Sequence, residues 1–171
     1  MNQDQQDNAS DNLTKEIERK FIISELPPEI KLDELESDKI DQGYLGIDER
    51  GATRIRRKGE HYFITWKGGN PTHSTERIEL EAELTKEQFD TLWPGTINRR
   101  VEKTRYIIPY DKYIIELDVL EGVNRGHILA EVEFESTEEA DKFQVPEWFG
   151  TDVTSEKRFD NASIATNGFP H

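Results

Sequence analysis

Two glutamates and a lysine occupy alternate positions in the segment Glu16-Ile17-Glu18-Arg19-Lys20, near the start of the sequence. Alternate side chains of a β-strand point to the same face, so Glu16, Glu18 and Lys20 would lie together. Two carboxylates at this spacing can share a magnesium or manganese ion and leave coordination positions for water and phosphate oxygens. An ordinary wet strand face with cross-strand salt bridges has the same pattern. The motif alone leaves both interpretations open.

Basic residues recur at the same alternate spacing farther along the chain. Arginine binds phosphate oxygens through two parallel N–H groups, and lysine binds them as a compact charge. We therefore interpret these residues as candidate phosphate ligands, although surface charge is the preferred interpretation for Lys58. The group consists of Arg54, Arg56, Lys58, Lys67, Lys103 and Arg105.

Acidic residues alternate in three further segments. Carboxylates in a line repel one another, so a line gathered round a cavity needs a cation, whereas an exposed line costs little. These residues can be further metal ligands, or they can hold the arginines in place. No histidine has a second histidine at ligand spacing, which argues against zinc. The acidic pairs are Glu79 with Glu81, Glu116 with Asp118, and Glu131 with Glu133.

The composition excludes several functional classes. The 171 residues carry a formal net charge of −14, which argues against binding nucleic acid by bulk attraction. The chain has no cysteine, so disulfides, thiolate metal sites and cysteine nucleophiles are excluded. No segment is apolar for long enough to span a membrane, and the polar residues 1–12 lack the apolar core of a signal peptide. We expect a cytoplasmic protein with a disordered tail at 1–12 and a single domain over 13–171.

The elements that must position these residues are mostly short strands separated by turn signals. Short turns predict antiparallel neighbours in an α+β, mainly β fold: an eight-stranded closed or nearly closed barrel with flanking helices and a C-terminal helix. Thr85 and Gln88 match a capping box at the start of a helix. Helices are predicted over 85–93, after Ser136 and over about 157–166, with a short helix or loop over 28–37. Strands are predicted over 14–24, 39–47, 52–58, 61–67, 74–84, 98–108, 113–121 and 127–135.

Charged and apolar side chains occupy opposite faces of most of these strands, and two arrangements satisfy that pattern. In one, the apolar faces form the interior and the charges meet solvent. In the other, the charges line a central tunnel and the apolar faces pack under outer helices and loops. The predicted helices favour the tunnel, because each needs an apolar sheet surface to cover. The pattern alone does not choose between them.

Taken together and in order, the charged segments resemble the CYTH superfamily, also called triphosphate tunnel metalloenzymes, and in particular its small bacterial inorganic triphosphatases. The resemblance covers about Leu13 to Ala165. It implies an eight-stranded antiparallel tunnel with inward charges, in a cytoplasmic enzyme that acts on a small-molecule triphosphate with Mg²⁺ or Mn²⁺. Homodimers occur in the family. The segments that carry the resemblance are EIERKF (16–21), RIRRK (54–58), WK (66–67), RIELEAELT (77–85), KTRY (103–106), IELDVLEG (115–122), AEVEFES (130–136) and SEKRFDNASIA (155–165).

The resemblance also implies roles for individual residues. Lys20 matches the lysine of the first motif, and Tyr44 stands where the small bacterial tripolyphosphatases carry a tyrosine that partners it. The implied metal ligands are Glu16, Glu18, Glu131 and Glu133. The implied phosphate ligands are Arg54, Arg56, Lys67, Arg77, Lys103 and Arg105. Looser matches, with a supporting role, are Glu79, Glu81, Glu116, Asp118 and Arg158.

The preferred hypothesis is metal-dependent hydrolysis of inorganic tripolyphosphate. A water would attack the terminal phosphorus in line, while Lys20, held by Tyr44, would orient that water or accept its proton. The alternatives are a class IV adenylate cyclase, a non-catalytic polyphosphate-binding module, and an acidic barrel whose charges are simply solvated. The sequence shows no convincing adenine pocket, and it does not rank tripolyphosphate against nucleoside triphosphates.

Overall fold

The computed structural model describes residues 13–14, 17–68 and 78–170, and its main feature is one antiparallel sheet. The strands of this described part are β1 (Leu13–Thr14), β2 (Ile17–Ile23), β3 (Ser37–Ile47), β4 (Gly51–Lys58), β5 (His61–Gly68), β6 (Ile78–Leu84), β7 (Arg100–Tyr110), β8 (Tyr113–Leu120) and β9 (Ile128–Phe134). They are hydrogen-bonded in the order β1-β6-β5-β4-β3-β7-β8-β9-β2, and every neighbouring pair is antiparallel. The predicted antiparallel arrangement is therefore confirmed.

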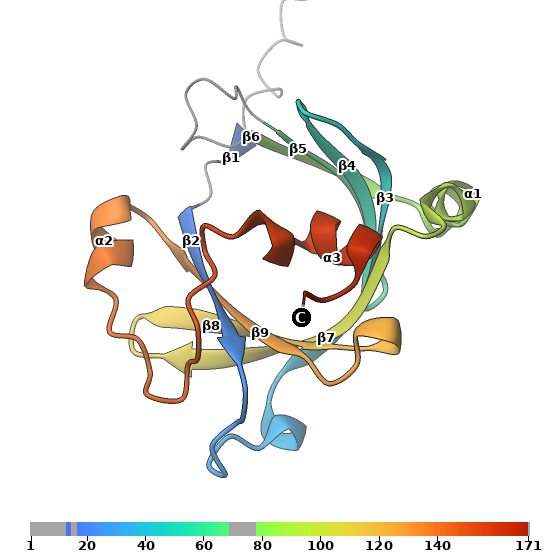
Figure 1. Cartoon of the computed structure of the whole chain (residues 1–171). Helices are drawn as coiled ribbons and strands as arrows, with labels where there is room; N and C mark the ends of the chain where they lie inside the picture. The colour runs from blue at the N-terminus through green and yellow to red at the C-terminus, as the bar shows by residue number, and fades with distance from the viewer. Residues whose placement is uncertain (1–12, 15–16, 69–77, 171) are drawn as a thin grey trace, which may run out of the picture.

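The two end strands of this sheet are consecutive in the chain, so the sheet curves round into a barrel (Figure 1). β1 pairs with β6 through Leu13–Leu80 and Thr14–Glu79. β2 begins three residues after β1 ends and pairs with β9 along its whole length. Because β1 and β2 share one position in the ring, the barrel has eight strand positions, which confirms the predicted fold.

Short helices connect and flank the strands. They are η1 (Leu32–Glu34), α1 (Lys86–Leu92), η2 (Trp93–Thr96), η3 (Gly122–Asn124), α2 (Thr137–Lys142), η4 (Lys157–Phe159) and α3 (Asn161–Asn167). The predicted capping box is present, with reciprocal bonds between Thr85 and Gln88. The sequence predicts one helix over 157–166, whereas the structure has η4 and α3, because the chain is extended at Asp160. Within the described residues no helix is long and apolar enough to cross a bilayer.

Apolar side chains on the outer surface of β2, β8 and β9 form the main core. Phe21, Leu117 and Val132 are no more than 1% exposed there. Phe143 and Phe149, from the chain that follows α2, cover them, and the rings of Phe21 and Phe149 lie 4.7 Å apart. Because successive strand residues alternate, the charged side chains of these strands face inward. The barrel therefore has the tunnel arrangement rather than the solvated one.

The inward-facing residues change from charged to apolar at one end of the barrel. Lys20 is followed by Ile22 on β2, and Lys103 is preceded by Val101 on β7. The C-terminal helix α3 lies across the ring of strands (Figure 1). Its Ile164 is buried against this apolar layer. Other members of the layer are Tyr44, Leu120 and Leu129. The helix therefore closes one end of the barrel.

Candidate functional site

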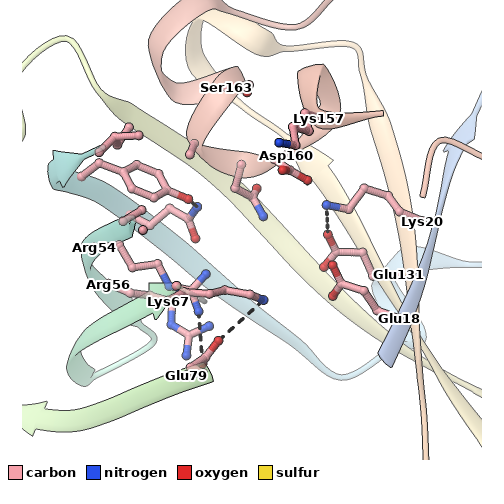
Figure 2. A pocket seen from close by; sticks show the side chains of 18 of the residues that line it. Glu18, Lys20, Arg54, Arg56, Lys67, Glu79, Glu131, Lys157, Asp160 and Ser163 are labelled. Carbon is pink, nitrogen blue, oxygen red and sulfur yellow. Dashed lines mark hydrogen bonds and ion pairs between the residues drawn. The ribbon is translucent and has the colours of Figure 1, made fainter. Parts of the chain in front are cut away.

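A cavity of about 710 Å³ occupies the interior of the barrel. Every strand from β2 to β9 contributes to its wall, as do η4 and α3. Figure 2 shows the basic side chains of β4 and β5 on one side and Lys20, Glu18 and Glu131 on the other. The residues discussed from the sequence that line the cavity are Glu18, Lys20, Tyr44, Arg54, Arg56, Lys58, Lys67, Glu79, Lys103, Arg105, Glu116, Glu131 and Glu133.

The other proposed residues lie elsewhere. Glu81 and Asp118 do not line the cavity, but each pairs with an arginine that does. The side chain of Arg158 is 59% exposed and pairs with Glu156 at 2.8 Å, so it does not join the site. Outside the described residues lie Glu16 and Arg77.

The register of β2 and β9 places Glu18 directly across from Glu133, and Lys20 directly across from Glu131. The Lys20 ammonium is 2.9 Å from Glu131 Oε1, and the two side chains are 7% and 8% exposed. The other carboxylate oxygen, Oε2, accepts a hydrogen bond from the Arg105 guanidinium at 2.9 Å. Both oxygens of Glu131 are therefore bound by buried cations.

These contacts fix the charge states of Lys20 and Glu131. Burial alone would raise the pKa of Glu131, but Lys20 and Arg105 outweigh it and hold that pKa well below its usual range. Burial alone would lower the pKa of Lys20, but Glu131 and Glu18 outweigh it and raise that pKa above its ordinary value. Lys20 is therefore an ammonium at neutral pH. In this state it donates hydrogen bonds and has no lone pair for a proton, and its role toward the attacking water stays a prediction.

Asp118 forms ion pairs with two cations that line the cavity, Lys103 and Arg105. Its Oδ2 atom is 2.5 Å from the Lys103 ammonium, and the two side chains are 1% and 2% exposed. Arg105 donates to both Asp118 oxygens at 2.7 Å and also pairs with Glu116. Burial lowers the pKa of Lys103, and Asp118 offsets only part of this effect. Asp118 thus has the geometry of the supporting role that the sequence predicts.

The opposite wall carries three basic side chains with acidic neighbours. Arg54 and Lys67 each lie 3.7 Å from Glu79, and Arg56 lies 2.9 Å from Glu81. Burial and the charge of Arg54 lower the pKa of Arg56, although a guanidinium stays protonated in proteins. The Nε–H groups of Arg54 and Arg56 are buried and have no hydrogen-bond partner among the described residues. Buried donors without acceptors are costly, and the oxygens of an anion would satisfy them.

Tyr44 lies at the apolar end of the cavity with its hydroxyl among polar neighbours. Gln42 donates a hydrogen bond to this hydroxyl at 3.3 Å, and Arg54 also contacts it. Burial raises the pKa of Tyr44, and the charges of Arg54 and Lys20 offset only part of the rise. The phenol is therefore neutral at physiological pH. Its interaction with Lys20 is electrostatic in this structure, and a direct contact between them stays a prediction.

Sequence reasoning missed the contribution of the C-terminal segment. Lys157, Asp160, Asn161 and Ser163 line the cavity. Lys157, Asp160 and Ser163 are labelled in Figure 2. Asp160 is the N-cap residue of α3, yet its side chain makes no capping hydrogen bond. The alternation that identifies strand residues does not apply to a 3₁₀ turn, and an aspartate at a helix start is ordinarily interpreted as a cap. The one available signal was the charged run before the last helix.

Carboxylates that suit a divalent cation face each other in the cavity. Within the described residues, no three acidic or histidine side chains converge on a metal-sized site. Magnesium does not require three, because it keeps several waters and takes one or two carboxylates together with substrate phosphates. Glu18 and Glu133, opposed across β2 and β9, supply such a pair. Glu131 would first have to release Lys20 or Arg105.

Comparison with known proteins identifies the family. The CYTH domain model matches residues 14–168. A Nitrosomonas europaea protein named inorganic triphosphatase is 40% identical over 153 residues, which are 88% of this chain and 96% of that protein. An Acetivibrio thermocellus protein of the same name is 29% identical over 156 residues, 91% of this chain and 96% of that protein. The crystal structure of an inorganic triphosphatase has 38% identity and a TM-score of 0.67, covering 90% of this chain and 95% of the other. This chain therefore belongs to the CYTH domain family.

Proposed function

We propose that this chain is a divalent-metal-dependent inorganic triphosphatase that hydrolyses inorganic tripolyphosphate. The two relatives support this proposal, because both carry that name and match nearly their whole length. The observation that carries it is the pair of buried Nε–H donors of Arg54 and Arg56, which lack partners in the described part of the chain. A phosphoryl group in the cavity would satisfy both donors while facing the carboxylates of the opposite wall.

Glu18 and Glu133 are the described residues that would hold the metal, together with Glu16 as the sequence predicts. When bound, Mg²⁺ or Mn²⁺ supplies charge neutralisation at the phosphate oxygens and lowers the pKa of a bound water. Hard carboxylate oxygens suit either ion, so assays with each metal must decide between them.

The chain's own residues bind the substrate and orient the water. Arg54, Arg56 and Lys67 present donors along β4 and β5, where they would stabilise the charge of the transferring phosphoryl group. Lys20, held as an ammonium by Glu131, would donate a hydrogen bond that directs the attacking water. The water would attack the terminal phosphorus in line as the bond to the bridging oxygen breaks, its proton would pass to a phosphate oxygen, and pyrophosphate would leave toward the basic side chains.

Arg56 and its neighbour Arg57 form a matched pair for the test. Arg56 lines the cavity, whereas Arg57 faces the other way and pairs with Asp41. Arg56→Ala should lower kcat/KM for phosphate release from tripolyphosphate by about 100- to 1,000-fold, the usual effect of removing one transition-state donor. Arg57→Ala should stay close to wild type. Circular dichroism would establish that both variants fold, and retained turnover by folded Arg56→Ala would refute the proposal.

A substrate panel with Mg²⁺ and with Mn²⁺ separates the alternative functions. Cyclic AMP formed from ATP, without phosphate release from tripolyphosphate, would identify a cyclase. A melting temperature raised by tripolyphosphate, without turnover under either metal, would identify a binding module. Relative kcat/KM values for tripolyphosphate, ATP and longer polyphosphates would rank the substrates.

The remaining proposals concern the domain organisation, cellular location and binding partners of the enzyme. We propose a single catalytic domain over residues 13–171, a cytoplasmic location and no nucleic-acid partner, the last supported by the net charge of −14. Cell fractionation would test the location. Light scattering after size exclusion would decide between a monomer and the homodimer known in the family.

A further inference from the structure

The strand that carries Glu18 and Lys20 is covered on its outer edge by a C-terminal strap, residues 150–154. One edge of β2 pairs with β9, and the strap lies along the other. The Ile22 N–H donates to the Thr151 carbonyl at 2.9 Å, and the Ile22 carbonyl accepts from the Gly150 N–H at 3.0 Å. The approach is close, since a Cβ at Gly150 would meet the Ile22 carbonyl oxygen at 2.5 Å.

At Lys20 the strap makes one contact of a different kind. The Lys20 carbonyl accepts from the Val153 N–H at 2.8 Å. The Lys20 N–H donates to the Thr154 hydroxyl at 3.0 Å, whereas Ile22 meets only main-chain atoms of the strap. This hydrogen bond therefore depends on a side chain, and a substitution can remove it without changing the backbone path.

The Thr154 hydroxyl is held in turn by Asp152 and Arg19, and we call these three residues the clasp. The hydroxyl donates to Asp152 Oδ1 at 2.5 Å, and the Thr154 N–H donates to the same oxygen at 3.0 Å. The other oxygen, Oδ2, accepts from Arg19 Nη2 at 2.6 Å and from Arg19 Nε at 3.1 Å. Because Arg19 adjoins Lys20 in β2, the clasp begins and ends on the same strand.

The clasp joins two parts of the cavity wall. On one side it fixes the main chain of Lys20, whose ammonium meets Glu131 at 2.9 Å inside the barrel. On the other side the strap continues into η4 and α3, which bring Lys157 and Asp160 to the cavity (Figure 2). The described residues that line the cavity do not include Arg19, Asp152 or Thr154. The influence of the clasp on a bound substrate must therefore pass through Lys20 and the C-terminal segment.

We propose that Thr154 and Asp152 are positioning residues for triphosphate hydrolysis, which set the place of Lys20 relative to the C-terminal segment. The inference rests on the proposed function. A misplacement of about 1 Å can cost about 100-fold in rate, so a loosened clasp should lower kcat. It should change KM little, because the strap's backbone hydrogen bonds to the sheet are made with β2, whereas Arg54, Arg56 and Lys67 lie on β4 and β5.

Thr154→Val tests the proposal, because valine keeps the shape of threonine. Its side chain can neither accept a hydrogen bond from the Lys20 N–H nor donate one to Asp152. We expect kcat to fall at least about tenfold for a displacement smaller than 1 Å, with KM nearly unchanged. Thr154→Ser restores a hydroxyl and should recover most of kcat. Thr91→Val is the matched control, since Thr91 makes its hydroxyl bond to the Glu87 carbonyl on α1, at 2.8 Å.

The outcomes separate positioning from a merely structural role. Wild-type kcat in Thr154→Val, or equal loss in the valine and serine variants, would overturn the proposal. If Thr154→Val does not fold, Asp152→Asn decides, with a lower kcat at unchanged KM expected and wild-type kcat overturning it. Wild-type protein without any turnover would overturn the proposed function and this inference with it. Normal turnover in the clasp variants would overturn this inference alone.

Discussion

Removal of Asp118 should destabilise the barrel far more than removal of a surface carboxylate. Asp118 is 1% exposed and binds both Lys103 and Arg105, so Asp118→Ala leaves two cations in the wall without their shared counterion. Breaking a buried ion pair by removing one partner costs about 3–5 kcal/mol. Since 1 kcal/mol shifts the melting temperature of a domain of this size by about 2–4 °C, we expect a fall of roughly 6–20 °C.

The effect can be measured by thermal melting and by urea unfolding at neutral pH, both followed by circular dichroism. Glu138→Ala is the matched control, because Glu138 pairs with Lys142 on α2 while the two side chains are 77% and 72% exposed. Exposed pairs of this kind contribute about 0.3–0.5 kcal/mol, so the control should lose less than about 2 °C. Asp118→Asn, which keeps one acceptor oxygen, should fall between the two.

A loss of about 1 kcal/mol or less in Asp118→Ala, the value of an ordinary hydrogen bond, would refute this reasoning. It would mean that Glu116 and Glu131 suffice as partners of Arg105, and that Lys103 reaches water or another carboxylate. The short contacts of Asp118 with Lys103 and Arg105 would then contribute less to the free energy of unfolding than their burial implies.

Two further predictions concern pH and packing. Because cations hold the pKa of Glu131 below 4.5, its stabilising effect is fully present above about pH 4.5 and is lost as pH falls through the folded pKa. Melts from neutral to acid pH should therefore show wild type and Glu131→Gln converging, and a constant difference would contradict this. Gly43→Ala should cost about 1–3 kcal/mol, because its Cβ would lie 2.5 Å from the Thr96 side chain. Gly46→Ala, with nothing within 4 Å of its Cβ, should melt like wild type, and equal melting of both variants would argue against the steric reasoning.

Alternation along the strands predicts which side chains share a face, but it does not reveal which face is inside. On β2 the same pattern separates Lys20 from Phe21, and both arrangements of the barrel satisfy it. The arrangement is decided by Phe143 and Phe149, which cover Phe21 from outside. Their place depends on the path of the chain after α2, and no local periodicity encodes that path.

The roles of single residues depend on strand register, which a short motif does not contain. Glu131 and Glu133 are the same residue type at alternate positions, yet Glu131 lies across from Lys20 and Glu133 across from Glu18. A register shift of two residues would place Glu131 across from Glu18, or Glu133 across from Lys20, without changing the faces. The sequence therefore predicts an acidic pair in the cavity, and the structure is needed to show which carboxylate lies across from Lys20 and which lies across from Glu18.

The C-terminal segment shows the same limit outside the sheet. Lys157 and Arg158 are adjacent basic residues in one 3₁₀ turn, and the sequence predicts a role for Arg158, which pairs with Glu156. Lys157 lines the cavity instead. In a tight turn, the directions of the side chains depend on how the chain is fixed on either side of the turn. Here the strap is hydrogen-bonded to β2 before the turn, and α3 packs on the apolar layer after it.

The apolar layer beneath α3 makes the barrel a blind tube. Val101, Leu120 and Leu129 are no more than 1% exposed there, so the described residues leave no passage for a charged chain at that end. Under the proposed function, substrate and products would then share one entrance, and the fragment nearer to it would leave before the inner one. A polyphosphate longer than the cavity cannot thread through. It would be trimmed from an inserted terminus, one short fragment at a time, rather than cut in its middle.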